Sequence, residues 1–147
     1  MQSYAEDWLR LVRTERIIAV IRSADLEMGR KMAQAVAAGG IKLIEITANS
    51  DRAWELIASL RTDLPNCSIG TGTVLTLDDI HQAIDCGAEY IFTPHVDRSL
   101  IQAAIAAQIP IVPGALSPTE IMTAWQSGAT AVKVFPIQAV GGVSYLQ

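Results

Sequence analysis

The chain has 147 residues, 50% of them hydrophobic and 18% charged, which is enough apolar material for one compact domain and argues against disorder. Its 11 basic and 15 acidic residues give a formal charge of -4 and are scattered, so the sequence lacks the basic patch of a nucleic-acid-binding protein. The apolar runs are short and the N-terminus does not resemble a signal peptide, so we expect a cytoplasmic protein with no nucleic acid or membrane as a partner.

The chain begins with a stretch of helical periodicity at residues 4–15, which precedes the first apolar strand and is placed to plug one end of a barrel. Beyond it, segments rich in β-branched residues alternate with stretches whose apolar residues recur every three or four positions. Six segments are predicted strands: residues 16–22, 41–47, 66–70, 89–93, 109–113 and 131–135. The alternation predicts an α/β fold with a parallel sheet covered by helices. The spacing does not choose between a (β/α)8 barrel of the TIM type and an open, doubly wound sheet.

Residues that favour helix ends mark the boundaries of the predicted helices. Glycines that favour the end of a helix stand just before three predicted strands: Gly39, Gly40, Gly87 and Gly128. Residues that favour the start of a helix follow the strands: Asp25, Asp51, Thr76, Asp97 and Ser117. We therefore expect capped helices after most of the strands.

One lysine, Lys133, lies in the apolar segment Val-Lys-Val-Phe-Pro of the sixth predicted strand. In a parallel sheet that is covered on both faces, its head group has to point into a barrel, where desolvation favours the neutral amine. Such an amine attacks carbonyl groups to form a Schiff base. The alternative is an edge lysine whose head group reaches solvent. Reactive groups gather at the carboxyl ends of the strands in both candidate folds, which favours the first interpretation.

Glu45 raises the same question on the second predicted strand. Because side chains alternate along a strand, Ile44 and Ile46 share one face and Glu45 lies on the other with Leu43 and Thr47. A buried glutamate near a lysine is either half of a structural ion pair or a general base. Carbanion chemistry next to a carbonyl needs an amine that forms an iminium electron sink and a base that moves the proton. A lysine and a glutamate at interior strand positions can supply both.

The segment Gly-Thr-Gly-Thr-Val-Leu at residues 70–75 resembles half of a dinucleotide-binding fingerprint, but Leu75 stands where the third glycine is needed. The glycines can instead allow another group to approach the backbone closely, or they can simply form a tight turn. Thr71 and Thr73 are candidates to place hydroxyl groups at the strand end. Arg22 ends the first strand, where it could bind a carboxylate or a phosphate, or form a salt bridge at the rim.

The remaining polar residues give weaker signals. His81 lies in a helical stretch and is expected at the surface, whereas His95 follows a strand end and could touch a substrate. Cys67 and Cys86 lack the spacing of a zinc site or a disulfide framework and are expected to pack as small core residues. We predict no metal.

Several motifs in register along the chain resemble the aldolase family that cleaves 2-dehydro-3-deoxy-6-phosphogluconate and 4-hydroxy-2-oxoglutarate. They run from about residue 16 to the end: IAVIR, AAGGIKLIEIT, IGTGTVLT, FTPH, IPIVPGALSPTEI and VKVFP. The resemblance implies a class I aldolase on a (β/α)8 barrel, which acts through a Schiff base and needs no cofactor. It also implies a small keto acid as substrate, pyruvate and an aldehyde as products, and a homotrimer.

The resemblance also implies roles for particular residues. Lys133 would form the Schiff base, and Glu45 would move protons at the pyruvyl methyl group and at the aldol hydroxyl, through water. The substrate would be bound at five further positions: Arg22, Asn49, Thr73, Pro94 and Phe135.

The chain departs from the family pattern in several places. Asn49 stands where the family usually has an arginine that binds the substrate carboxylate, and His95 stands where a glycine is usual. Ile137 and Gln138 replace the usual alanine and glutamate. The chain ends at Gln147, whereas a (β/α)8 barrel needs eight strands, so we expect a single barrel domain over residues 1–147 that is incomplete at its C-terminus, with about six of its eight units.

Two other functions remain open from the sequence. The missing units and Asn49 are compatible with an inactive, truncated barrel that serves as an oligomerising or ligand-binding module. A sugar-phosphate epimerase or isomerase on a similar barrel is the other alternative, although such sites do not need a lysine on the sixth strand.

Overall fold

The computed structural model describes residues 4–147, within which it has six β-strands, six α-helices and two short 3-10 helices. The strands are β1 (Ala19–Ile21), β2 (Leu43–Thr47), β3 (Ser68–Gly72), β4 (Ile91–Thr93), β5 (Ile111–Ala115) and β6 (Lys133–Val134). The helices are α1 (Tyr4–Glu15), α2 (Leu26–Ala38), α3 (Ala53–Asp63), α4 (Leu77–Asp85), α5 (Arg98–Ala106), α6 (Pro118–Gln126), η1 (Ile137–Val140) and η2 (Gly142–Leu146). None of the helices in this part of the chain is both long and apolar enough to span a bilayer.

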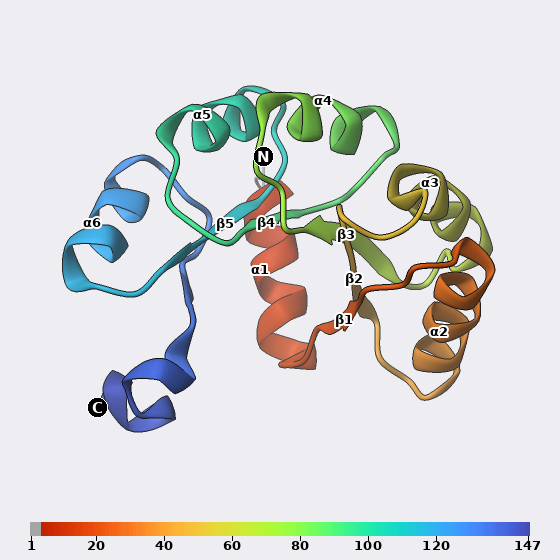
Figure 1. Cartoon of the computed structure of the whole chain (residues 1–147), viewed down its shortest axis with the longest axis horizontal. Helices are drawn as coiled ribbons and strands as arrows, with labels where there is room; N and C mark the ends of the chain where they lie inside the picture. The colour runs from red at the N-terminus through yellow and green to blue at the C-terminus, as the bar shows by residue number, and fades with distance from the viewer. Residues whose placement is uncertain (1–3) are drawn as a thin grey trace.

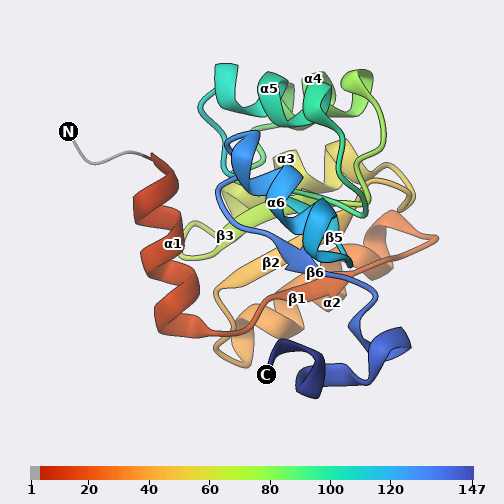
Figure 2. The same ribbon diagram turned by 90° about the vertical axis from the view of Figure 1, so that its left-hand side faces the viewer.

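All six strands form one parallel sheet in the order in which they occur along the chain. Helices α2 to α6 form an arc around this curved sheet (Figure 1), and α1 is set apart from them (Figure 2). A doubly wound sheet reverses its strand order part-way and carries helices on both faces, so that alternative is wrong. The observed fold is a half-barrel of six parallel strands, which confirms the predicted α/β architecture.

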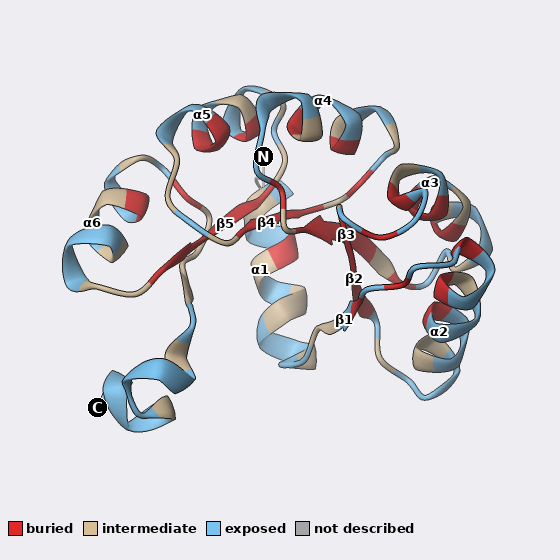
Figure 3. Cartoon of the chain, in the orientation of Figure 1, coloured by how far each residue is buried: buried red, intermediate tan, exposed pale blue. Residues whose placement is uncertain are grey.

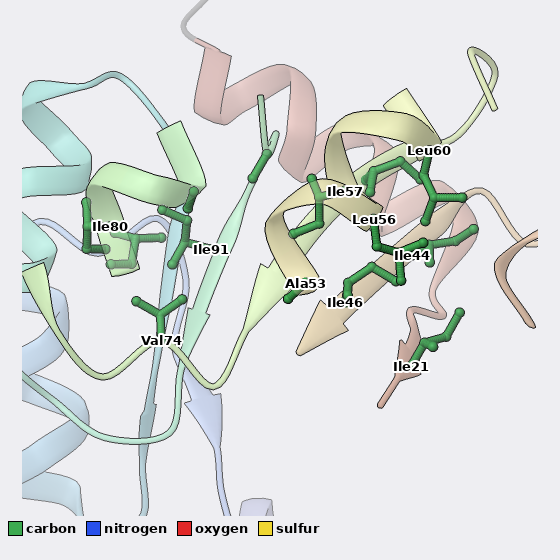
Figure 4. Packing of buried hydrophobic residues seen from close by; sticks show 14 of the residues in the cluster. Ile21, Ile44, Ile46, Ala53, Leu56, Ile57, Leu60, Val74, Ile80 and Ile91 are labelled. Carbon is green, nitrogen blue, oxygen red and sulfur yellow. The ribbon is translucent and has the colours of Figure 1, made fainter. Parts of the chain in front are cut away.

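The larger hydrophobic core lies between the sheet and the surrounding helices (Figure 3). Ile44 and Ile46 of β2 are fully buried in this core together with Leu56 and Ile57 of α3 (Figure 4). Because successive strand residues point to opposite faces, Glu45 faces the concave side of the sheet. The predicted side-chain alternation on β2 is therefore confirmed.

Helix α1 packs against the concave side of the sheet, at the amino-terminal ends of the strands. Its Trp8 is buried in a second core cluster with Leu43, Tyr90, Phe92 and Val112. The ring centroids of Trp8 and Tyr90 are 5.2 Å apart, a spacing typical of stabilising aromatic pairs. The prediction that residues 4–15 form a helix is confirmed, and this helix packs across one end of the half-barrel.

Strands β1 and β6 are the outermost strands of the sheet, and their outer edges pair with no other strand among residues 4–147. Val20, which faces inward on β1, is 59% exposed, and Lys133 and Val134 of β6 are half-buried. The interior of the half-barrel is thus open between its first and last strands.

Most of the predicted helix ends are confirmed. Four side chains accept a hydrogen bond as N-caps: Asp25, Thr76, Asp97 and Ser117. The prediction for Asp51 is wrong, because helix α3 has Arg52 at its N-cap, without a side-chain cap. The Asp51 N–H donates to the Ser23 carbonyl at 2.8 Å, which holds Asp51 in the preceding turn. Three of the helix-ending glycines have positive φ values: Gly40, Gly87 and Gly128.

Strands β3 and β5 begin and end two residues later than predicted. Before β3, the Cys67 N–H donates to the Leu64 carbonyl, so residues 66–67 still belong to the turn after α3. At its other end, Gly72 remains in the strand, and its carbonyl accepts from the Ala48 N–H at 2.8 Å. Glycine is unfavourable in strands by propensity, but pairing with β2 overrides that preference here.

Candidate active site

The two proposed catalytic residues face the same interior space. Residues that are paired between adjacent parallel strands point to the same side of the sheet. Glu45 is paired with Gly70, and Gly114 is paired with Lys133. Val112, two residues before Gly114 on β5, belongs to the inner cluster with α1. Lys133 therefore points to the concave side, as Glu45 does.

Lys133 lies beside two aromatic rings. Its Nζ is 4.3 Å from the ring centroid of Phe135 and 5.9 Å from that of Phe92 on β4, within the range of cation–π contacts. The side chain is only half-buried, whereas a strand covered on both faces was expected. The reason is that β6 is an outer strand of the open sheet, so solvent reaches it from one side.

Glu45 is 4% exposed. Burial raises the pKa of its carboxyl group above the ordinary value, and the positive charges of Lys133 and Arg22 act in the opposite direction. Among residues 4–147, Glu45 forms no salt bridge, which argues against a structural ion pair. A carboxyl group whose pKa is raised toward neutrality can both give and take a proton, as a general acid and base must.

The two glycines of β3 make room for neighbouring side chains. A side chain at Gly72 would overlap the carboxylate of Glu45 from β2, and one at Gly70 would overlap the ring of Tyr90, which precedes β4. Both glycines lie within the strand, so the interpretation as a plain tight turn is wrong. The close-approach interpretation is confirmed, and the approaching groups are side chains from the two adjacent strands.

Arg22 is held at the carboxyl end of β1 by a small hydroxyl network. Its Nε donates to Thr47 Oγ1 at 3.4 Å, and this oxygen is 3.1 Å from Ser50 Oγ. The backbone N–H of Ser23 donates to the same Ser50 oxygen. Thr47, Ser50 and Ser23 are buried, whereas Arg22 is exposed. Arg22 forms no salt bridge with residues 4–147, so the rim salt bridge is not observed.

The other predicted substrate-binding residues also lie just beyond strand ends. Asn49 is exposed in the turn after β2, and Thr73, with a φ of 58°, directly follows β3. Pro94 follows β4, and its carbonyl oxygen leaves no room for a side chain at Gly114. Phe135, 41% exposed, follows β6 and contacts Lys133. The structure thus places the five predicted substrate-binding residues just beyond the carboxyl ends of strands, although within residues 4–147 the Asn49 side chain forms no hydrogen bond.

Two of the other candidate residues are not part of this arrangement. Thr71 is fully buried and donates to the Ile46 carbonyl, so its hydroxyl does not reach the strand end. His81 is exposed on α4, as expected. His95 is exposed near the site, and its carbonyl accepts from Thr93 Oγ1 at 2.7 Å. Within residues 4–147, no group of three or more histidine, cysteine or acidic side chains could hold a metal ion.

Residues 9–147 match the family model of the KDPG and KHG aldolases, where KDPG is 2-dehydro-3-deoxy-6-phosphogluconate and KHG is 4-hydroxy-2-oxoglutarate. The chain belongs to this aldolase family. The resemblance seen in the sequence motifs is thereby confirmed.

Individual aldolases of the family support the assignment. The KHG/KDPG aldolase of Escherichia coli (strain K12) is 31% identical over 137 residues, which cover 93% of this chain and 64% of that protein. The structure of KDPG aldolase from Legionella pneumophila, with pyruvate captured at low pH as a covalent carbinolamine intermediate, has a TM-score of 0.86 and 30% identity, covering 99% of this chain and 68% of that one. The structure of the 2-keto-3-deoxy-6-phosphogluconate aldolase of Zymomonas mobilis ZM4 with 3-phosphoglycerate has a TM-score of 0.88 and 27% identity. The match covers 97% of this chain and 68% of that one. This chain therefore spans less than two thirds of the length of its Escherichia coli relative.

Two residues of the candidate aldolase site were not predicted from the sequence. Tyr90 lies inside the half-barrel next to Gly70, and strand alternation with Phe92 and Pro94 is the signal that could have identified it. Ser50 links Ser23 to Thr47, and no local pattern in the sequence distinguishes it from other turn serines.

Proposed function

We propose that this chain carries the reacting part of a class I aldolase. It cleaves a 2-keto-4-hydroxy acid, such as 2-dehydro-3-deoxy-6-phosphogluconate or 4-hydroxy-2-oxoglutarate, to pyruvate and an aldehyde. The observation that carries the proposal is that the Lys133 amine and the Glu45 carboxyl face one interior space and interact electrostatically. The named capture of pyruvate as a carbinolamine in the Legionella pneumophila aldolase supports a lysine nucleophile.

In the proposed reaction, the neutral Lys133 amine adds to the keto carbon C2 and gives a carbinolamine, which takes up one proton from solvent and loses water to form an iminium ion. The Glu45 carboxylate then takes the proton of the C4 hydroxyl group, directly or through water. As it does so, the electrons of the C3–C4 bond move toward the iminium nitrogen, so that the aldehyde leaves and an enamine remains. Glu45 returns its proton to C3, and water hydrolyses the new iminium ion to pyruvate and free Lys133.

The raised pKa of Glu45 suits this cycle, because the same group has to be a base before cleavage and an acid after it. Arg22 and, once the substrate is bound, the iminium nitrogen on Lys133 supply the positive charge that keeps the carboxylate form accessible. In this mechanism, the protein stabilises both protonation states of one carboxyl group, and no metal or organic cofactor is required.

The substrate carboxylate is proposed to bind at Arg22. Because the Nε of Arg22 is directed to Thr47, and its terminal nitrogens have no partner in residues 4–147, a carboxylate can bind to them. Asn49 adds a neutral hydrogen-bond donor where the family usually has a second cation. Thr73, Pro94 and Phe135 surround the pyruvyl end; the last two supply apolar surface.

We further propose that two additional β/α units close the half-barrel into a (β/α)8 barrel, against the free edges of β1 and β6. Residues 1–147 then form most of one barrel domain. We propose a homotrimer, and Met122 and Trp125 of α6, which are 50% and 61% exposed, are candidates for its apolar contact. The free thiols Cys67 and Cys86 support a reducing, cytoplasmic location.

The activity is tested by pyruvate release from each keto acid, followed with lactate dehydrogenase and NADH. The chain is expected to release pyruvate, and Lys133→Met is expected to reduce the rate to background because it removes the nucleophile. Lys42→Met is the matched control, because Lys42 is exposed and forms an ion pair with Glu15 far from the site. Absence of turnover in the unsubstituted chain would favour the inactive-module alternative, and equal loss in both variants would contradict the role of Lys133.

A further inference from the structure

Tyr90 places a buried hydroxyl group inside the half-barrel. Tyr90 is completely buried, and its Oη has no hydrogen-bond partner among residues 4–147. Leaving a buried hydroxyl group unpaired is unfavourable, and such groups are normally satisfied by the protein or by a buried water. The Nε1 of Trp8, whose ring packs on that of Tyr90, is also buried without a partner.

The position of the Tyr90 ring is fixed from three sides. It lies over Gly70, where no side chain would fit, with its centroid 5.2 Å from that of Trp8 and 5.8 Å from that of Phe92. The ring centroid of Phe92 is in turn 5.9 Å from Lys133 Nζ. The ring of Tyr90 is therefore part of the packed layer that adjoins the reacting groups.

Tyr90 and Glu45 are neighbours along the concave face of β3. The Tyr90 ring covers Gly70, and the Glu45 carboxylate covers Gly72, the next inward-facing position on the same strand. Alternate residues of a strand are separated by about 6.6 Å, so the two side chains occupy successive inward positions, and Glu45 is the strongest of the charges that act on Tyr90.

The charges around the two groups are consistent with this placement. Burial raises the pKa of Tyr90, and the negative charges of Glu45 and Glu89 and the Cys67 thiol raise it further. The backbone of Gly70, whose contact with Oη falls short of hydrogen-bond geometry, acts in the opposite direction. Tyr90 therefore keeps its proton to higher pH than an ordinary tyrosine and can donate it in a hydrogen bond. The other charged groups that act on Glu45 are Lys133 and Arg22.

We propose that Tyr90 is a positioning residue for Glu45: its hydroxyl donates to a buried water, and that water donates to the Glu45 carboxylate. The arrangement satisfies the buried hydroxyl and holds the carboxylate over Gly72. It also favours the charged form of Glu45, because a donated hydrogen bond stabilises a carboxylate more than a carboxylic acid. The inference rests on the proposed function only in giving Glu45 a role in proton transfer.

The substitution Tyr90→Phe tests the proposal because it removes the hydroxyl group and keeps the ring that packs on Gly70. The pKa of Glu45 is measured directly, by a carbon NMR titration of the chain labelled at its glutamate carboxyl groups, with Glu45→Gln used to assign the signal. We expect Tyr90→Phe to raise the pKa of Glu45 by about 1 unit. Tyr4→Phe is the matched control, since Tyr4 is 59% exposed on α1, and should leave the titration unchanged.

The second readout is the exchange of pyruvate methyl protons with deuterated water, which reports the proton-transfer step. In Tyr90→Phe, the acidic limb of the exchange rate should move to higher pH by the same amount as the NMR titration. An unchanged or lowered Glu45 pKa, or a loss of exchange that is uniform across pH, would overturn the proposal. If the unsubstituted chain neither exchanges pyruvate protons nor forms an adduct on Lys133, the proposed function fails, while the NMR titration still decides the link between Tyr90 and Glu45.

Discussion

The carboxylate of Glu45 fills the space beside the bare backbone of Gly72 on the neighbouring strand. Glycine has a low intrinsic preference for β-strands, so strand propensity does not explain its presence at this position of β3. The glycine is instead required because any side chain at this position would displace the group that we propose to transfer protons.

Replacing Gly72 with alanine should therefore reduce activity much more than stability. The new methyl group has to push the flexible carboxylate aside, so kcat should fall by about 100-fold or more, whereas overpacking should lower the free energy of unfolding by about 1–3 kcal/mol. Pyruvate release and urea denaturation measure the two effects. The control is Gly39→Ala, where a new Cβ would lie at an ordinary 3.4 Å from the Val36 carbonyl oxygen. Wild-type kcat in Gly72→Ala would contradict the packing relationship.

Glu45→Gln should abolish proton transfer and flatten the pH dependence of stability. We expect kcat to fall by about 10²- to 10⁴-fold. The unfolded chain releases the Glu45 proton near its ordinary pKa, whereas burial makes the folded chain keep that proton to higher pH. The wild type therefore loses stability as the pH rises from about 4.5, and a neutral glutamine cannot contribute to this loss. Thermal melting between acidic and neutral pH measures the difference, and parallel curves for both proteins would show that the pKa of Glu45 is not raised.

Arg22 and Asn49 should control the affinity for the substrate carboxylate. Arg22→Met removes the cation at the end of β1, so KM should rise by about tenfold or more with a smaller change in kcat. Asn49→Arg adds a second cation and should lower KM. Arg98→Met, an exposed substitution on α5, serves as the control. The assignment would be wrong if Arg22→Met changed kcat and left KM unaltered.

Trp8→Ala should show that α1 supports the interior of the half-barrel. Trp8 is 6% exposed and packs against Tyr90 and Phe92, so its removal should lower the free energy of unfolding by about 3–5 kcal/mol. The matched substitution is Tyr4→Ala on the same helix, where the side chain is 59% exposed and the change should be within about 0.5 kcal/mol. Urea denaturation followed by circular dichroism distinguishes the two, and equal effects would argue against a structural role of α1.

The positions of Glu45 and Lys133 could be predicted because strand periodicity depends only on the local sequence. Side chains alternate along β2, so a glutamate between two isoleucines has to face away from the helices. Capping residues such as Thr76 and Ser117 were predictable for the same local reason, since their side chains bond to backbone groups within the first helical turn.

Features that depend on neighbouring strands could not be predicted. The half-burial of Lys133 follows from the outer position of β6, and the need for Gly70 and Gly72 follows from the side chains of Tyr90, just before β4, and Glu45 on β2, which lie against β3. Asp51 was a reasonable N-cap by residue type, but its N–H bonds to the carbonyl of Ser23, a residue distant in sequence, and the N-cap of α3 is Arg52.

The proposed mechanism requires Lys133 to form a Schiff base with pyruvate, and borohydride reduction in the presence of pyruvate traps that adduct. The chain has three lysines: Lys31 is exposed on α2, Lys42 pairs with Glu15, and Lys133 faces the interior. Peptide mass mapping after reduction should find the pyruvyl adduct on Lys133, with Lys31 and Lys42 unmodified. An unmodified Lys133 in the folded chain, or an adduct spread evenly over the three lysines, would contradict the account.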